Sequence, residues 1–193
     1  ATIDDDARYL DLVQAVSPQT SSKVVGICAL DAGFMWGLQQ HYCQLYDVAP
    51  DDELVWKMVA MTEELGTVLN VSHASIILMA HRLMTQEGAP WPNVDNLIKS
   101  ADAAVAFVTL VQQLQQWEPV LAQIIVLTAW SHRGLREMEL LTLIDTLNQA
   151  QLRRYKEIIL DELFFPIFGV YDFVNASLKL ALRTSMCAKE SRK

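Results

Sequence analysis

The chain has 193 residues, of which 52% are hydrophobic and 20% are charged, and its formal net charge is −8. This length and composition are typical of a globular domain with a substantial core, and they exclude disordered and fibrous chains. An acidic chain repels phosphate backbones, so we expect no nucleic-acid partner.

Apolar residues recur at helical spacing along nearly the whole chain, and neither strand alternation nor hairpin dipeptides such as Asn-Gly or Asp-Gly stand out. We therefore predict an all-α fold, a bundle of about seven to eight helices. Proline, glycine and capping residues separate the expected helices. In chain order these helices cover residues 4–16, 22–47, 50–65, a fourth ending at 87, 93–117, 119–133, 135–163 and 166–187.

The helices expected at 93–117 and 119–133 contain the most apolar runs, Ala101–Val111 and Val120–Trp130. Each run is about half of the roughly 20 residues that a membrane-spanning helix needs. We therefore predict a buried central helix pair and no membrane span, while peripheral membrane contact stays open. The apolar stretch 163–182 contains Asp172 and Lys179, and charged residues are costly inside a bilayer.

The segment Ala89–Pro92 is a short, proline-rich linker and the one candidate domain boundary. Neither side of it has an obvious core of its own. We predict a single all-α domain over residues 1–193, with a weak boundary candidate at 88–93.

The three cysteines, Cys28, Cys43 and Cys187, show no close pairing motif. If Cys28 and Cys43 share one helix, they lie about 22 Å apart, which is too far for a disulfide. The first residues are acidic, unlike those of a secretory signal. We expect reduced thiols and an intracellular compartment, either the cytoplasm or an organelle matrix.

The sequence lacks the common motifs of catalysis and metal binding. A di-iron bundle requires a glutamate three positions before a histidine on two of its helices. None of the four histidines has an acidic residue at that position. Cys-x-x-Cys, phosphate-binding, dinucleotide-binding and Gly-x-Ser-x-Gly motifs are also absent from it. We therefore expect no metal, no cofactor and no catalytic residue, and an enzyme is disfavoured.

Asp31 is the most unusual acidic residue, because a helical wheel places it in the middle of an apolar face of helix 22–47. A buried carboxylate must be paired or protonated. Three interpretations stay open: a tuned acid or ligand contact, a buried ion pair with another helix, or a local helix break near Gly33. The two structural interpretations carry more weight than the functional one.

The same helix has a stripe of small residues that includes Gly26, Gly33 and Gly37. Glycine is unfavourable inside a helix, so three on one stripe suggest that another backbone approaches closely. Packing within the chain is the favoured explanation, and a subunit contact is the alternative.

The expected helix 166–187 has one apolar stripe for the core and further apolar residues away from it. Phe173 and Leu180 form a second ridge, and Phe168 lies on another side. Exposed aromatic residues mark partner surfaces, so we predict these three as candidate interface residues. The alternative, which we weigh equally, is that this helix is buried on all sides and has no interface.

Three functions fit these patterns. We favour a non-catalytic helical subunit, adaptor or regulator that acts through protein–protein contacts, in a larger assembly or a homo-oligomer. The first alternative is a small-molecule-binding module or enzyme with a pocket between helices, in which Asp31 and one of the histidines supply the polar groups. The second is an acidic inhibitor that occupies a basic site, since residues 1–96 hold four basic and 13 acidic side chains.

Overall fold

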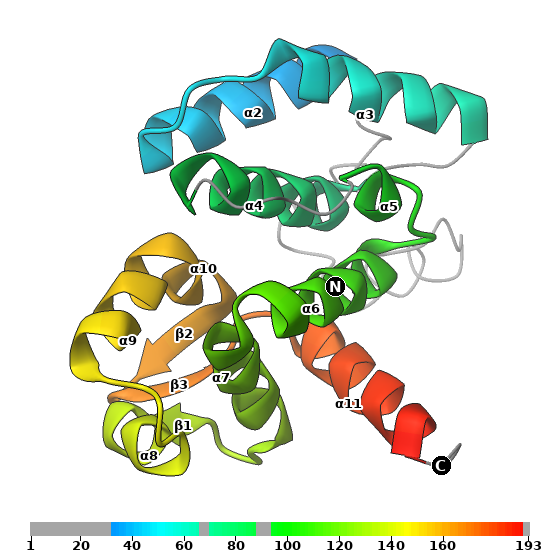
Figure 1. Ribbon diagram of the computed structural model, residues 1–193. Helices are drawn as coiled ribbons and strands as arrows, with labels where there is room; N and C mark the ends of the chain where they lie inside the picture. The colour runs from blue at the N-terminus through cyan, green and yellow to red at the C-terminus, as the bar shows by residue number, and fades with distance from the viewer. Residues whose placement is uncertain (1–31, 66–69, 88–93, 191–193) are drawn as a thin grey trace, which may run out of the picture.

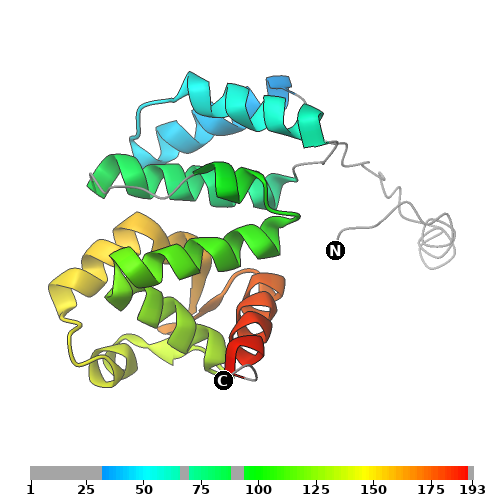
Figure 2. The same cartoon turned by 45° about the vertical axis from the view of Figure 1, so that its right-hand side comes forward.

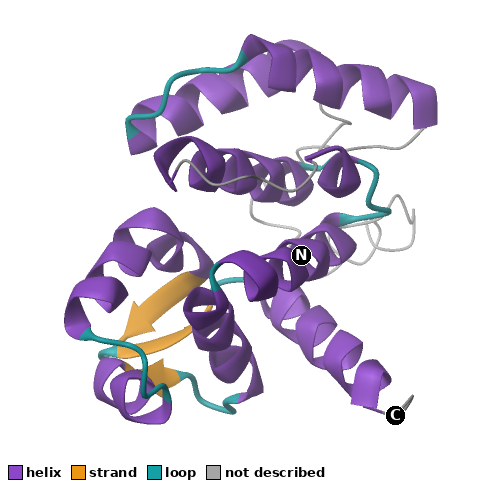
Figure 3. Ribbon diagram, viewed as in Figure 1, coloured by secondary structure: helices purple, strands orange, loops and turns teal. Residues whose placement is uncertain are grey.

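The computed structural model describes residues 32–65, 70–87 and 94–190, and helices dominate these ranges (Figure 1). The all-α fold class is therefore confirmed, with one small sheet added (Figure 3). The helices are α2 (Ala32–Tyr46), α3 (Asp52–Leu65), α4 (Val71–Glu87), α5 (Val94–Ile98), α6 (Ala103–Trp117), α7 (Pro119–Trp130), α8 (Glu137–Leu143), α9 (Gln149–Tyr155), the π-helical turn η1 (Lys156–Leu160), α10 (Asp161–Leu163) and α11 (Ala176–Glu190). The strands are β1 (Leu135–Arg136), β2 (Phe164–Ile167) and β3 (Val170–Phe173).

Several expectations fall on residues outside these ranges: the helix at 4–16, the linker at 88–93, Gly26, Cys28 and Asp31. None of the described helices combines the length and the apolar character that crossing a bilayer requires.

The helices are stacked in layers, which both views show (Figure 1, Figure 2). α2 and α3 form an outer layer, and α4 and α5 lie between this layer and α6. α6 contacts α4, α5, α7 and α11, so it joins the layered half to the part that holds the sheet. α8, α9 and α10 surround the sheet, and α11 lies beside α6 and α7.

The expected central helix pair is present as α6 and α7, and each buries a continuous set of apolar side chains. Phe107, Leu110 and Leu114 of α6 and Ile124 and Ile125 of α7 are fully buried. The helix expected at 93–117 is divided, because the side chain of Asp102 caps a new helix start by accepting a hydrogen bond from the Val105 N–H (2.8 Å).

The single helix expected at 135–163 is wrong, since the chain forms β1, α8, α9, η1 and α10 there. The break between α8 and α9 has a local cause at Asn148. Its side chain accepts from the Gln151 N–H (2.9 Å), and the Gln151 side chain accepts from the Asn148 N–H (3.1 Å). This reciprocal cap starts α9 anew.

The helix expected to start at residue 166 is also wrong, because residues 164–173 form a β-hairpin and α11 starts only at Ala176. β2 and β3 pair antiparallel with Ile167 opposite Val170, which leaves Phe168 and Gly169 as a two-residue turn. Both turn residues have positive φ, +52° and +76°, as a type I′ hairpin requires. β1 adds to the other edge of β3, so the strand order is β1-β3-β2.

Candidate functional site

A groove with a volume of about 590 Å³ lies between α6 and α11. Leu180 on α11 is 64% exposed, and Val105 on α6 is 46% exposed. No lining residue is charged. The residues that line this α6/α11 groove are Ala104, Val105, Val108, Thr109, Gln112, Ser177, Leu180, Ala181, Thr184 and Ser185.

The groove forms because each of the two helices has large side chains on its core-facing side and mostly small ones on its outer side. α6 turns its large buried side chains, such as Phe107 and Leu110, into the core, and α11 does the same with Leu178 and Leu182. The opposite positions carry mostly alanine, serine and threonine, which are too short to fill the space between two crossing helices. Leu180 stands on this outer side, where nothing else in the described chain covers most of its surface.

The three interface residues expected on helix 166–187 lie in three different environments. Leu180 lines the α6/α11 groove. Phe173 lies in β3, where it packs edge-on against Phe107 and Phe164, with ring centroids 6.0 and 4.8 Å apart. The ridge expected from Phe173 to Leu180 therefore does not exist. Phe168 stands at the hairpin turn with 98% of its surface exposed.

The small-residue stripe is described only at Gly33 and Gly37, and both lie on the exposed side of α2. A Cβ added at Gly37 would meet no described atom within 4 Å. No close packing partner for Gly37 thus lies in the described part of the chain, and a subunit contact there stays a prediction.

A buried ionic cluster joins α2, α4, η1 and α10, and the sequence reasoning did not find it. Arg82 of α4 is 1% exposed, and its Nη2 lies 3.2 Å from Oε2 of Glu162 and donates to the Ile158 carbonyl. Tyr42 donates its hydroxyl to the same Glu162 oxygen (2.8 Å). The guanidinium lies over the Tyr46 ring, 3.6 Å from its centroid.

The electrostatics of this cluster are those of a structural ion pair. Burial raises the pKa of the Glu162 carboxyl, although Tyr42 and Arg82 favour its ionised form. Burial and the adjacent Glu162 also raise the pKa of Tyr42. Among the described residues, Nε and Nη1 of Arg82 find no hydrogen-bond partner. The cluster thus connects α2, α4, η1 and α10 through side-chain contacts, and Arg82 does not line the α6/α11 groove.

A second polar cluster holds the outer layer in place. Nε2 of His81 lies 3.1 Å from Oδ2 of Asp51, whose other oxygen caps α3 by accepting from the Leu54 N–H (3.1 Å). Gln39 of α2 donates to the Asp51 carbonyl (2.5 Å). Burial and the nearby Asp51 raise the pKa of the Cys43 thiol, which disfavours a reactive thiolate. Within the described ranges, no group of three His, Cys, Asp or Glu side chains is placed to hold a metal ion.

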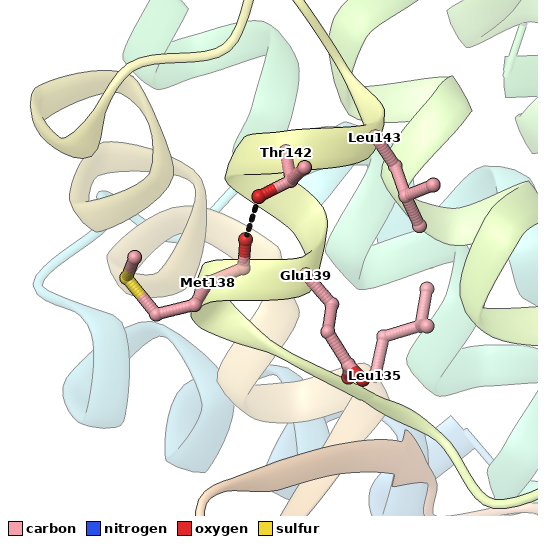
Figure 4. Close-up of a pocket in the computed structure, with 5 residues that line it drawn as sticks. All are labelled: Leu135, Met138, Glu139, Thr142 and Leu143. Atoms are coloured by element: carbon pink, nitrogen blue, oxygen red, sulfur yellow. Dashed lines mark hydrogen bonds between the residues drawn. The ribbon is translucent and has the colours of Figure 1, made fainter.

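A shallow hollow of about 380 Å³ lies beside α8 (Figure 4). Met138 points away from the other lining side chains, and Thr142 donates its hydroxyl to the Met138 carbonyl (2.7 Å). Glu139 is engaged locally, because its carboxylate accepts from the Arg136 N–H (2.7 Å). Both polar side chains that line this hollow thus make hydrogen bonds to backbone groups nearby.

The α6/α11 groove is thus an uncharged hollow with exposed apolar side chains, and it is separate from the two buried polar clusters. Comparisons with known protein families, with curated proteins and with solved structures found no match to this chain.

Proposed function

We propose that the chain is a non-catalytic helical subunit or adaptor that binds a protein partner through the α6/α11 groove. The observation that carries this proposal is an uncharged hollow between two helices with Leu180 standing 64% exposed at its edge. Amphipathic helices bind in such grooves through apolar residues spaced by three or four positions. A partner helix would cover Leu180 and Val105 and remove their apolar surface from water.

The polar chemistry of the described residues supports binding rather than catalysis. Arg82, Glu162, His81 and Asp51 contact one another or nearby tyrosine and backbone groups. None of them lines the groove. The groove itself offers hydroxyl and amide groups, which orient a bound helix by hydrogen bonds at its rim.

The test is an affinity isolation from the producing organism with two matched variants. Leu180→Asp places a charge in the groove, and Leu45→Asp places the same charge on α2 at a leucine that is also 64% exposed. We expect a stoichiometric protein partner with the wild type and with Leu45→Asp, and at least a 30-fold loss of affinity for Leu180→Asp, because burying one leucine contributes about 2 kcal/mol. Circular dichroism should show the same helicity for all three.

Two results would contradict the proposal. One is equal partner recovery with Leu180→Asp and with Leu45→Asp. The other is a wild-type protein that carries a bound small molecule by native mass spectrometry and no protein partner.

A further inference from the structure

The β2–β3 hairpin ends in a phenylalanine that is almost fully exposed. Phe168 and Gly169 form the two-residue turn, and both have positive φ. Phe165, three residues earlier in β2, is also exposed. No charged residue occurs between Phe164 and Tyr171. The end of the hairpin, residues 165–169, is therefore an uncharged apolar projection, which we call the hairpin tip.

The same chain contains a hollow of matching chemistry, the α6/α11 groove. Its lining is uncharged, and its volume of about 590 Å³ lies within the range of roughly 300–1,000 Å³ that is typical of ligand pockets. An aromatic side chain that entered it would contact the exposed side chains of Val105 and Leu180. The molecule thus presents an apolar projection and an apolar hollow at separate places.

The hairpin does not place its tip in the groove of its own chain. At about 3.3 Å per residue, Phe168 lies roughly 17 Å along the strand direction from Phe173, whose ring packs against Phe107 of α6. β3 is paired on both edges, by β1 and by β2, which fixes its direction. In Figure 1 the turn between β2 and β3 lies at the left, whereas α11 runs to the lower right.

We propose that the hairpin tip of one copy of the chain inserts into the α6/α11 groove of a second copy, with Phe168 as the inserted side chain. The inference rests on the proposed function in one respect, that the groove receives a protein, and it names a second copy as an occupant. Because tip and groove lie at different places on the surface, each copy can donate a tip and receive one. Such a heterologous contact produces a ring or an open chain of copies, not a symmetric pair.

The charges beside the two surfaces are complementary. Arg136 of β1 is exposed and pairs with Val170 next to the turn. Asp102 is exposed and stands two positions before Ala104, the first residue that lines the groove. Opposite charges at the rims of two apolar surfaces favour their association and fix its register.

The area of the tip indicates how strong the contact is. Phe165 and Phe168 are 61% and 98% exposed, and a phenylalanine buries about 150–250 Å², so covering both removes roughly 300 Å² from water. A standard interface buries about 800 Å² on each partner. We therefore expect a weak contact, and assembly that increases with protein concentration.

The test is sedimentation velocity of the purified full chain from about 1 μM to about 1 mM. Phe168→Asp removes the inserted side chain, and aspartate tolerates positive φ. Leu180→Asp charges the groove, and Leu45→Asp is the matched control on α2. We expect the wild type and Leu45→Asp to assemble, and each of the other variants to bind itself at least about 30-fold more weakly. Circular dichroism should show equal helicity for all four proteins.

Mixing the two defective variants identifies the geometry. The groove of Phe168→Asp and the tip of Leu180→Asp are both intact, so their equimolar mixture should form a dimer through one contact, although each variant alone stays monomeric. A symmetric interface made by either surface alone would not be restored in this way.

Photo-crosslinking locates the contact without a disruptive variant. With p-benzoylphenylalanine in place of Phe168, in a mixture of isotope-labelled and unlabelled chains, we expect crosslinks between copies to residues 104–112 or 177–185. A wild type that stays monomeric at every concentration, a mixture that forms no dimer, or crosslinks to another surface would each overturn the inference.

The inference and the proposed function fail separately. A dimer in the mixture, together with equal recovery of a different protein by Leu180→Asp and Leu45→Asp from the producing organism, would uphold the contact between copies and refute the proposed function. A monomeric wild type, together with loss of that protein in Leu180→Asp, would do the reverse.

Discussion

Replacing Arg82 by methionine tests whether the buried ion pair holds α2 and α10 against α4. The guanidinium is almost completely buried, 3.2 Å from the Glu162 carboxylate and stacked on Tyr46. Methionine retains an unbranched apolar side chain but removes the charge. The Glu162 carboxylate would then keep the Tyr42 hydrogen bond and lose its cation.

The expected loss follows from the contacts of these two residues. Removing one partner of a buried pair costs about 3–5 kcal/mol, and the low end applies because Glu162 is only partly buried. Losing the cation–π contact adds about 1 kcal/mol. Removing the unpartnered Nε and Nη1 of Arg82 offsets about 1 kcal/mol. We expect the free energy of unfolding to fall by about 3 kcal/mol.

Urea unfolding at pH 7, followed by circular dichroism, measures this loss. The double variant Arg82→Met/Glu162→Leu should recover to within about 1 kcal/mol of the wild type, because no unpaired charge remains. The control is Lys57→Met, which breaks the more exposed ion pair with Asp95 and should cost less than about 1 kcal/mol. An Arg82→Met loss no larger than that of Lys57→Met would refute the reasoning.

The remaining stability predictions concern two glycines and one histidine. Gly134→Ala should lower the free energy of unfolding by at least about 2 kcal/mol, because φ is +79° and the new Cβ would collide with the Tyr171 carbonyl. Gly37→Ala should instead raise the free energy of unfolding by about 1 kcal/mol, because alanine favours a helix and its Cβ would meet no described atom within 4 Å. Urea titration of both variants measures these changes. Burial lowers the pKa of His73 below 6.5, so its contribution is present above pH 6.5 and is lost as the pH falls toward the folded-state pKa. His73→Gln should flatten the fall in melting temperature between pH 7.5 and 5.5, and the same slope in both proteins would contradict this.

The helical class and the central pair follow from apolar periodicity, but the same signal conceals the break after α8. Leu140, Ile144 and Leu147 keep helical spacing and are all buried, although the chain leaves the helix between them. A short helix followed by a loop therefore buries these three side chains as well as one continuous helix would. The informative signal was the Asn148–Gln151 cap, which is local and independent of apolar spacing.

The ionic cluster of Arg82 and Glu162 could not be predicted from the sequence, for a different reason. Arg82 stands inside an apolar helix, much as Asp31 does in the expected helix 22–47, so it could be noticed as unusual. Its partner Glu162 lies 80 positions later, and no local sequence pattern marks the π-helical turn that presents the Ile158 carbonyl. Such pairs form only through tertiary structure.

Phe168 combines an unfavourable backbone with a side chain that packs against almost nothing. Its φ is +52°, a conformation that costs an L-residue about 1–2 kcal/mol, and 98% of its surface is exposed. Asparagine tolerates this conformation and would precede Gly169, which makes the favoured type I′ dipeptide. We expect Phe168→Asn to raise the free energy of unfolding by about 1 kcal/mol in urea titration.

The same variant tests the prediction that Phe168 belongs to an interface. A residue kept at a cost to stability is explained if a partner covers it, so Phe168→Asn should gain stability and lose partner affinity in the same preparation. Phe165→Asn is the control, because this exposed phenylalanine lies in β2 and carries no positive φ. A gain in stability with unchanged partner affinity would show that Phe168 is not part of the interface. Partner binding would then be attributed to the α6/α11 groove. No gain in stability would refute the backbone argument itself.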